Sequence, residues 1–249
     1  MMTDTDLAER PAETPLFYAR PEPLTVAVQG DWRLRPGGYA FAADTNIVML
    51  AATEFAAAAR SYPILFAGND GSPVALLGLE RANLFVADGQ WAEDCYIPAY
   101  VRRYPFVFYA TGEADRFVLG IDVESDRIVR EGEEGAALFD GDTASVLTTQ
   151  ALHFCEAFRR DSEATILFAE ALAPLLIDQR AAITLVSGER FDIDGFRVVD
   201  RERFAALDDA TVLEWHRKGW LALVHFHLAS LDRFQALLDR QQAASPRQC

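Results

Sequence analysis

The chain has 249 residues, of which 51% are hydrophobic and 24% are charged, and its formal net charge is −15. This length and composition are typical of a folded protein with a substantial hydrophobic core. The acidity argues against nucleic-acid binding and against adhesion to an anionic membrane, because both partners are negatively charged.

The first sixty residues predict little regular structure. Residues 1–15 are expected to form a flexible tail, followed by a short strand over residues 16–20. Residues 24–29 (Leu-Thr-Val-Ala-Val-Gln) have a composition typical of a strand. Residues 48–60 contain a run of four alanines, which favours a helix that ends at Tyr62-Pro63.

The middle third reads as consecutive strands. A β-hairpin is expected from Ile64 to Leu79, because Gly68-Asn69-Asp70-Gly71 favours a tight turn. Further strands are expected over residues 84–86, 105–110 and 116–122, with Gly112-Glu113 between the last two. Strands joined by such short turns predict an antiparallel sheet.

The C-terminal half is mainly helical in its spacing. Residues 145–176 predict a long helix, which Asp161-Ser162-Glu163 either interrupts or caps again. Short strands follow over residues 184–186, 191–193 and 196–199. The pattern then predicts a short helix over residues 200–207 and a further region that begins at Asp208-Asp209. It ends with a final helix over residues 220–238. Residues 241–249 are expected to be frayed. We therefore predict an α+β fold in one domain over residues 16–240, with the central antiparallel sheet packed against the C-terminal helices.

Several segments together resemble one protein family. They include Tyr62-Pro-Ile-Leu-Phe-Ala-Gly-Asn69, Asn83-Leu-Phe-Val86 with Gly89 and Trp91, and the run from Tyr96 to Phe106. The second half adds Phe191-Asp-Ile-Asp-Gly-Phe196 and His227-Leu-Ala-Ser-Leu231. Over most of its length the chain resembles the bacterial SapC family.

This resemblance implies an association with a bacterial surface layer. It also implies a link to systems that contain TonB-dependent receptors and flavin-dependent halogenase-like proteins. The family offers no established catalytic residues that could be carried over to this chain.

The most unusual segment is Tyr96-Ile-Pro-Ala-Tyr-Val-Arg-Arg-Tyr-Pro-Phe106, in which Arg102 and Arg103 lie among aromatic and aliphatic residues. On a strand these two side chains would point to opposite faces. They could form an anion site, since guanidinium groups bind carboxylates in a bidentate manner. The other interpretation, which the usual pairing of buried arginines favours, is a structural ion pair with one of the chain's own acidic residues.

Other polar motifs give no assembled site. His225 and His227 are two residues apart on an expected helix, where their side chains diverge and do not share a metal. His153 and Cys155 meet the same objection as a catalytic pair. Asp192-x-Asp194-Gly195 reads as a turn. No standard phosphate or dinucleotide loop occurs, and we expect no cofactor and no metal.

Location is inferred from what the sequence lacks. No apolar run approaches the roughly 20 residues that span a bilayer, and the N-terminus has no pattern of a secretory signal. Cys95, Cys155 and Cys249 form no disulfide framework. We expect a cytoplasmic protein without membrane insertion, and export without a cleaved signal stays open.

Three functional hypotheses follow. The first is a non-enzymatic binding or accessory protein that recognises a protein or peptide partner through the surface from Trp91 to Phe106, including Tyr96, because aromatic residues and arginine concentrate at interfaces. The second is a small-molecule-binding domain or enzyme with a pocket built from Asn69, Arg102, Arg103, Tyr104 and His227. The third is a surface-layer component, which requires export.

Overall fold

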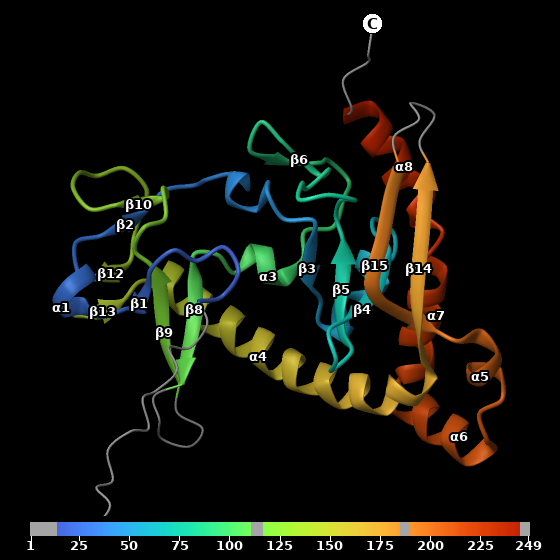
Figure 1. Cartoon of the computed structure of the whole chain (residues 1–249). Helices are drawn as coiled ribbons and strands as arrows, with labels where there is room; N and C mark the ends of the chain where they lie inside the picture. The colour runs from blue at the N-terminus through green and yellow to red at the C-terminus, as the bar shows by residue number, and fades with distance from the viewer. Residues whose placement is uncertain (1–13, 111–116, 185–189, 245–249) are drawn as a thin grey trace, which may run out of the picture.

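The computed structural model describes residues 14–110, 117–184 and 190–244 of the chain. Two antiparallel sheets form its framework, and one long helix, α4 (Val146–Leu172), begins beside one sheet and continues below the other (Figure 1). Residues 1–13 and 245–249 lie outside the described residues, as do Gly112-Glu113 and residues 185–189. None of the helices in the described ranges combines the length and apolar character needed to cross a membrane.

The larger sheet has five strands, all paired antiparallel. Their order is β14 (Leu176–Thr184), β15 (Arg190–Val199), β4 (Ile64–Ala67), β5 (Ser72–Leu76) and β3 (Ile47–Met49). The predicted hairpin is confirmed as β4 and β5, whose turn places Gly68 and Gly71 at φ values of 66° and 71°. These left-handed values suit glycine and explain why the turn was readable from sequence.

The smaller sheet lies beside the N-terminal half of α4 (Figure 1). It consists of β1 (Pro21–Pro23), β9 (Phe117–Asp122) and β8 (Phe106–Ala110). Short pairs surround the two sheets: β2 (Arg33–Leu34) with β10 (Ile128–Val129) and β11 (Ala136–Ala137), β6 (Val86–Ala87) with β7 (Gln90–Trp91), and β12 (Phe139–Asp140) with β13 (Thr143–Ala144).

The remaining helices are short. They are α1 (Val26–Gln29), α2 (Phe55–Ala58), α3 (Ala99–Arg102), α5 (Arg201–Ala205), α6 (Asp209–Lys218), α7 (Trp220–Ser230) and α8 (Arg233–Ala244), with single 3-10 turns η1 (Ala40–Ala42), η2 (Ala52–Glu54) and η3 (Ala173–Leu175). Helices α2 and α7 pack against each other, and α7 packs against β4 and β15. The α+β class, with an antiparallel sheet against C-terminal helices, is therefore confirmed.

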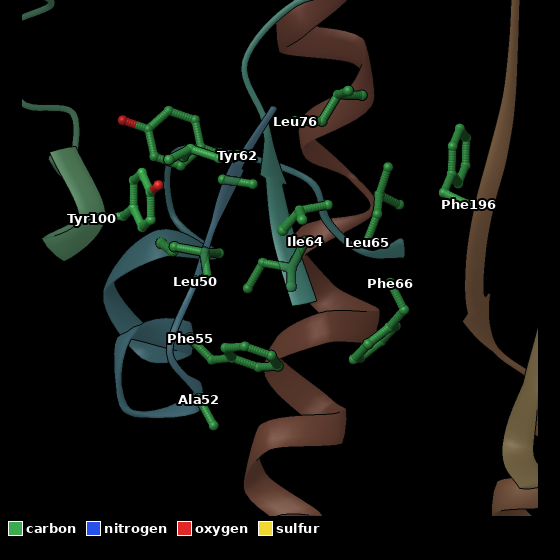
Figure 2. Close-up of a cluster of buried hydrophobic side chains, with 14 of the residues drawn as sticks. Leu50, Ala52, Phe55, Tyr62, Ile64, Leu65, Phe66, Leu76, Tyr100 and Phe196 are labelled. Carbon is green, nitrogen blue, oxygen red and sulfur yellow. The ribbon is translucent and has the colours of Figure 1, made fainter. Parts of the chain in front are cut away.

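The main core lies between the larger sheet and these helices. Figure 2 shows Ile64, Phe66 and Leu76 from the hairpin gathered with Leu50 and Phe55, all of them buried. Phe55 also meets the ring of Phe168 from α4 edge-on, with the ring centroids 6.0 Å apart. This packing joins α4 to the larger sheet.

His227 is a structural residue of this core. Its side chain is fully buried, its Nδ1 lies 2.8 Å from the carbonyl oxygen of Ile64, and the backbone N–H of Val199 donates to its Nε2 at 3.1 Å. The ring must therefore be neutral with its proton on Nδ1. Burial lowers the pKa of His227 to about 4. The imidazole thus bridges β4 and β15 from α7.

Several local predictions were wrong in the N-terminal part. Residues 16–20 form no strand, because the carboxylate of Asp122 accepts the backbone N–H groups of Ala19 and Arg20 at 3.0 and 2.8 Å. Residues 24–29 contain the helical turn α1 in place of a strand, because the Gln29 side chain accepts the N–H of Thr25 at 2.8 Å. The expected helix over residues 48–60 is divided into β3, η2 and α2.

Boundaries also moved in the C-terminal half. The helix expected over residues 145–176 ends at Leu172, and the strand β14 begins at Leu176. Asp161-Ser162-Glu163 does not interrupt α4, which is continuous from Val146 to Leu172, and the Ser162 hydroxyl donates to the carbonyl of Phe158 at 2.8 Å within the helix. The final helix is two helices, α7 and α8, although the short helix after Asp200 is confirmed as α5.

Candidate functional site

The arginine segment is a single helical turn, α3, held in place by a buried carboxylate. One oxygen of Glu54, Oε1, accepts the backbone N–H of Ala99 at 2.6 Å and the hydroxyl of Tyr96 at 2.9 Å. Its other oxygen, Oε2, accepts the N–H of Ala51 at 2.8 Å. Because Ala99 is the first residue of α3, this carboxylate fixes where the helical turn begins and so positions Arg102 and Arg103.

Arg102 is exposed and lies over the surface of α4. Its Nε donates to the carbonyl of Ile97 at 3.0 Å and its Nη2 donates to the hydroxyl of Tyr96 at 3.1 Å. The guanidinium carbon lies 5.2 Å from the centre of the Phe154 ring. Arg102 donates to the hydroxyl of Tyr96, which in turn donates to the buried carboxylate of Glu54, so the three side chains form a continuous hydrogen-bonded chain. Burial raises the pKa of Tyr96 to about 12.

Arg103 is half-buried among aromatic rings. Its guanidinium carbon lies 4.0 Å from the centre of the Tyr100 ring, 4.7 Å from that of Phe158 and 5.7 Å from that of Tyr18. Such contacts stabilise a cation without neutralising it. Its Nε is buried and has no hydrogen-bond partner among the residues that the structure describes. Within the described ranges, neither Arg102 nor Arg103 forms an ion pair with a carboxylate.

The strand geometry considered for the pair was wrong, because Arg102 is the last residue of the helical turn α3 and Arg103 is its C-cap, also in helical conformation. Their side chains do not point to opposite faces and instead border one pocket. Its volume is about 260 Å³. It lies between α3, the smaller sheet and the N-terminal half of α4, and its walls are Leu34, Arg102, Arg103, Tyr104, Phe106, Arg127, Leu147, Gln150, Ala151, Phe154 and Cys155. We call it the arginine pocket.

Arg127 is the third guanidinium of the arginine pocket, and no sequence pattern predicted it. It lies just before β10, and its Nη1 donates to the carbonyl of Tyr104 at 3.2 Å while its Nε donates to that of Arg35 at 3.3 Å. Burial lowers the pKa of Arg127. A partly desolvated cation of this kind gains from an anionic partner.

The charge of the arginine pocket is one-sided. Three arginines line it, and no aspartate or glutamate does so among the described residues. Its floor is apolar, formed by residues such as Leu147 and Phe154. Cys155 is also present, but burial raises the pKa of this thiol to about 11, so it stays protonated at neutral pH and is a poor nucleophile.

The other predicted site residues are distributed through the structure. Tyr104 lines the arginine pocket, and its hydroxyl donates to Asp122 at 3.1 Å. Trp91 is buried, with its Nε1 donating to the hydroxyl of Tyr62 at 2.9 Å. Asn69 is exposed in the β4–β5 turn, and His227 lies in the core. The structure thus brings Arg102, Arg103 and Tyr104 together, with Tyr96 as a neighbour bonded to Arg102.

Glu54 was also missed as a positioning residue. A signal for it was present, because a carboxylate inside the apolar run Leu50-Ala-Ala-Thr-Glu-Phe55 requires polar partners. No group of three or more His, Cys, Asp or Glu side chains could hold a metal ion in the part of the chain that the structure describes.

Comparison with known proteins identifies a protein family. The SapC family model matches residues 26–237, which include all the elements that form the arginine pocket. No curated protein and no solved structure matches the chain significantly. Since the matched segment covers most of the sequence, this chain belongs to the SapC family.

Proposed function

We propose that this protein is a non-enzymatic binding protein that captures a carboxylate of a peptide or protein partner in the arginine pocket. The observation that carries the proposal is the meeting of Arg102, Arg103 and Arg127 around one pocket that, among the described residues, has no acidic lining residue. Because the chain has a formal net charge of −15, the positive charge of this site contrasts with the net negative charge of the molecule.

The dimensions of the arginine pocket favour part of a chain over a whole small molecule. Its volume of about 260 Å³ is below the roughly 300–1,000 Å³ of sites that enclose a small organic ligand. An acidic side chain or a C-terminal carboxylate with one apolar side chain fits this size. The carboxylate would meet the guanidinium groups, and the apolar group would contact Leu147 and Phe154 on the floor.

The test compares acetylated hexapeptides that end in leucine or phenylalanine, each as the free acid and as the amide. We expect the free acids to bind at least about tenfold more tightly, because a charge-assisted hydrogen bond contributes about 1.5–3 kcal/mol. Replacement of Arg103 by glutamine (Arg103→Gln) is expected to abolish this difference. Fluorescence anisotropy of labelled peptides measures both effects.

Arg160→Gln is the matched control, because Arg160 is exposed on α4 and lies outside the arginine pocket. Its affinities should equal those of the wild type. Equal binding of acid and amide forms by the wild type would contradict the proposal. Inhibition by succinate at the peptide's own concentration would favour the alternative, a small-molecule site.

The resemblance to SapC proteins directs the search for the partner. We propose that it belongs to a surface-layer or TonB-receptor-associated system and that this protein meets it in the cytoplasm. Cell fractionation is then expected to recover the protein with the cytoplasmic supernatant. Recovery in the surface-layer extract would support the alternative, a surface-layer component.

A further inference from the structure

A second and larger cavity lies on the other half of α4. Its volume is about 510 Å³, within the roughly 300–1,000 Å³ of sites that enclose a small organic molecule. It forms where the C-terminal half of α4 passes below β3 and the start of β5 (Figure 1). Phe158 separates this cavity from the arginine pocket, because the guanidinium of Arg103 stacks over its ring. We call it the α4 cavity.

The walls of the α4 cavity are mainly apolar. Leu50, Pro73, Phe158 and Ala169 contribute from the core side. At its mouth, Met49 and Ile166 expose 45% and 56% of their surface. Exposed apolar side chains at the rim of a cavity mark a place where an apolar ligand would remove surface from water.

The hydroxyl groups that line the α4 cavity already donate their protons in hydrogen bonds within the protein. The Ser72 hydroxyl donates to Asp70 at 2.6 Å, that of Ser162 donates to the carbonyl of Phe158 at 2.8 Å, and that of Thr165 donates to the carbonyl of Asp161 at 2.6 Å. A hydroxyl has one proton and two lone pairs. These side chains therefore offer acceptors to a ligand, and not donors.

The charged groups of the α4 cavity are acidic. Asp70 and Glu170 line it, and no lysine, arginine or histidine does so among the described residues. Hydrogen bonds from Ser72 hold the pKa of Asp70 below its usual value, so this carboxylate is ionised at neutral pH. Arg197 lies beside the turn, but its Nη2 donates to the carbonyl of Gly68 at 2.7 Å and it is not part of the lining.

We propose that the α4 cavity binds a small apolar cation, namely a protonated primary amine on an aliphatic or aromatic body. The apolar body would contact Phe158 and Ile166. The ammonium group, which has three donors and no acceptor, would donate to Asp70 and Glu170 at the mouth. This site is separate from the arginine pocket and does not depend on the function proposed for it.

Three probes of similar shape test the charge requirement. Phenethylamine, phenethyl alcohol and hydrocinnamate carry a cation, a neutral group and an anion on the same phenyl body. We expect phenethylamine to bind about tenfold more tightly than the alcohol, with no binding of hydrocinnamate. Titration of the full chain, followed by amide chemical shifts in NMR spectra, measures the affinities and locates the site.

Variants locate the binding energy. Glu170→Gln and Asp70→Asn are each expected to weaken phenethylamine about three- to tenfold and to leave the alcohol unchanged. Ser162→Phe fills the α4 cavity and is expected to remove the binding of both. Glu156→Gln, an exposed charge change on α4 outside the lining, should leave phenethylamine binding unchanged.

The proposal is overturned if the alcohol binds as tightly as the amine, or if Glu170→Gln and Asp70→Asn both leave the amine affinity unchanged. It is also overturned if shifts appear in the α4 cavity with a basic apolar peptide but not with phenethylamine, which would make the cavity a peptide-docking site. Asp70 and Glu170 are both exposed, so the Asp70→Asn and Glu170→Gln results together decide the question even if Ser162→Phe does not fold.

Discussion

Glu54→Ala is expected to lower the free energy of unfolding by about 3–5 kcal/mol. The carboxylate of Glu54 is buried and accepts three hydrogen bonds, from the N–H groups of Ala51 and Ala99 and the hydroxyl of Tyr96. Its removal would leave these donors without acceptors, and each buried unsatisfied group costs about 1–3 kcal/mol. Urea denaturation followed by circular dichroism measures the change.

Glu54→Gln keeps one carbonyl oxygen as an acceptor. Its free energy of unfolding should therefore lie between that of the wild type and that of Glu54→Ala. Glu156→Ala, an exposed change on α4, is the control and should stay within about 0.5 kcal/mol of the wild type. A loss below 1 kcal/mol for Glu54→Ala would show that water or another group replaces the carboxylate. The account of how α3 is positioned would then be wrong.

The second large effect is on acid stability. The pKa of His227 is about 4 in the folded protein because of burial, below the 6.5 of an unfolded histidine. Between these values the unfolded chain takes up a proton that the folded chain does not. The stability that His227 contributes is therefore full above pH 6.5 and is lost as the pH falls toward 4, by about 3 kcal/mol in total.

The measurement is the free energy of unfolding from urea titrations at a series of pH values. Carboxylates also titrate in this range, so the prediction concerns the difference between the wild type and His227→Gln. Between pH 4 and 6.5, the free energy of unfolding of that variant should change less steeply with pH than that of the wild type. For His216→Gln, an exposed change on α6, it should change as steeply as in the wild type. Parallel curves for the wild type and His227→Gln would contradict the assignment.

Local signals predicted some elements well. The β4–β5 hairpin was readable because its turn needs residues that adopt positive φ, and Gly68 and Gly71 supply them. Helix α5 was readable because Asp200 accepts the N–H groups of Glu202 and Arg203 at 2.9 and 3.2 Å, as a helix cap does. In both cases the structure depends on residues that are close in sequence.

Elements decided by distant contacts were not predictable in this way. Residues 16–20 lack a strand because Asp122, a hundred positions away, satisfies their N–H groups. The expected helix ended at residue 176 and no element was expected over residues 177–183, but in the fold Leu176–Thr184 form β14, which pairs with β15. The hydrophobic periodicity of one segment contains no information about a partner that lies elsewhere in the chain.

The candidate site follows the same division. Arg102 and Arg103 were visible because charged residues in an aromatic run require an explanation. Arg127 was not, since Ser125-Asp-Arg-Ile128 is an ordinary polar loop sequence and only the fold carries it to Tyr104. His227 looked like a site residue for the same reason as the arginines, because buried polar groups need partners whether their role is in folding or in binding.

The most direct test of the arginine pocket is the Nε–H signal of Arg103 in NMR spectra during titration with a free-acid peptide ending in leucine. Because this nitrogen is buried and has no hydrogen-bond partner in the described part of the chain, a bound carboxylate should shift its signal in a saturable manner, and the amide form of the peptide should not. If the Arg103 signal stays unchanged while the peptide shifts residues elsewhere, the pocket is not the binding site.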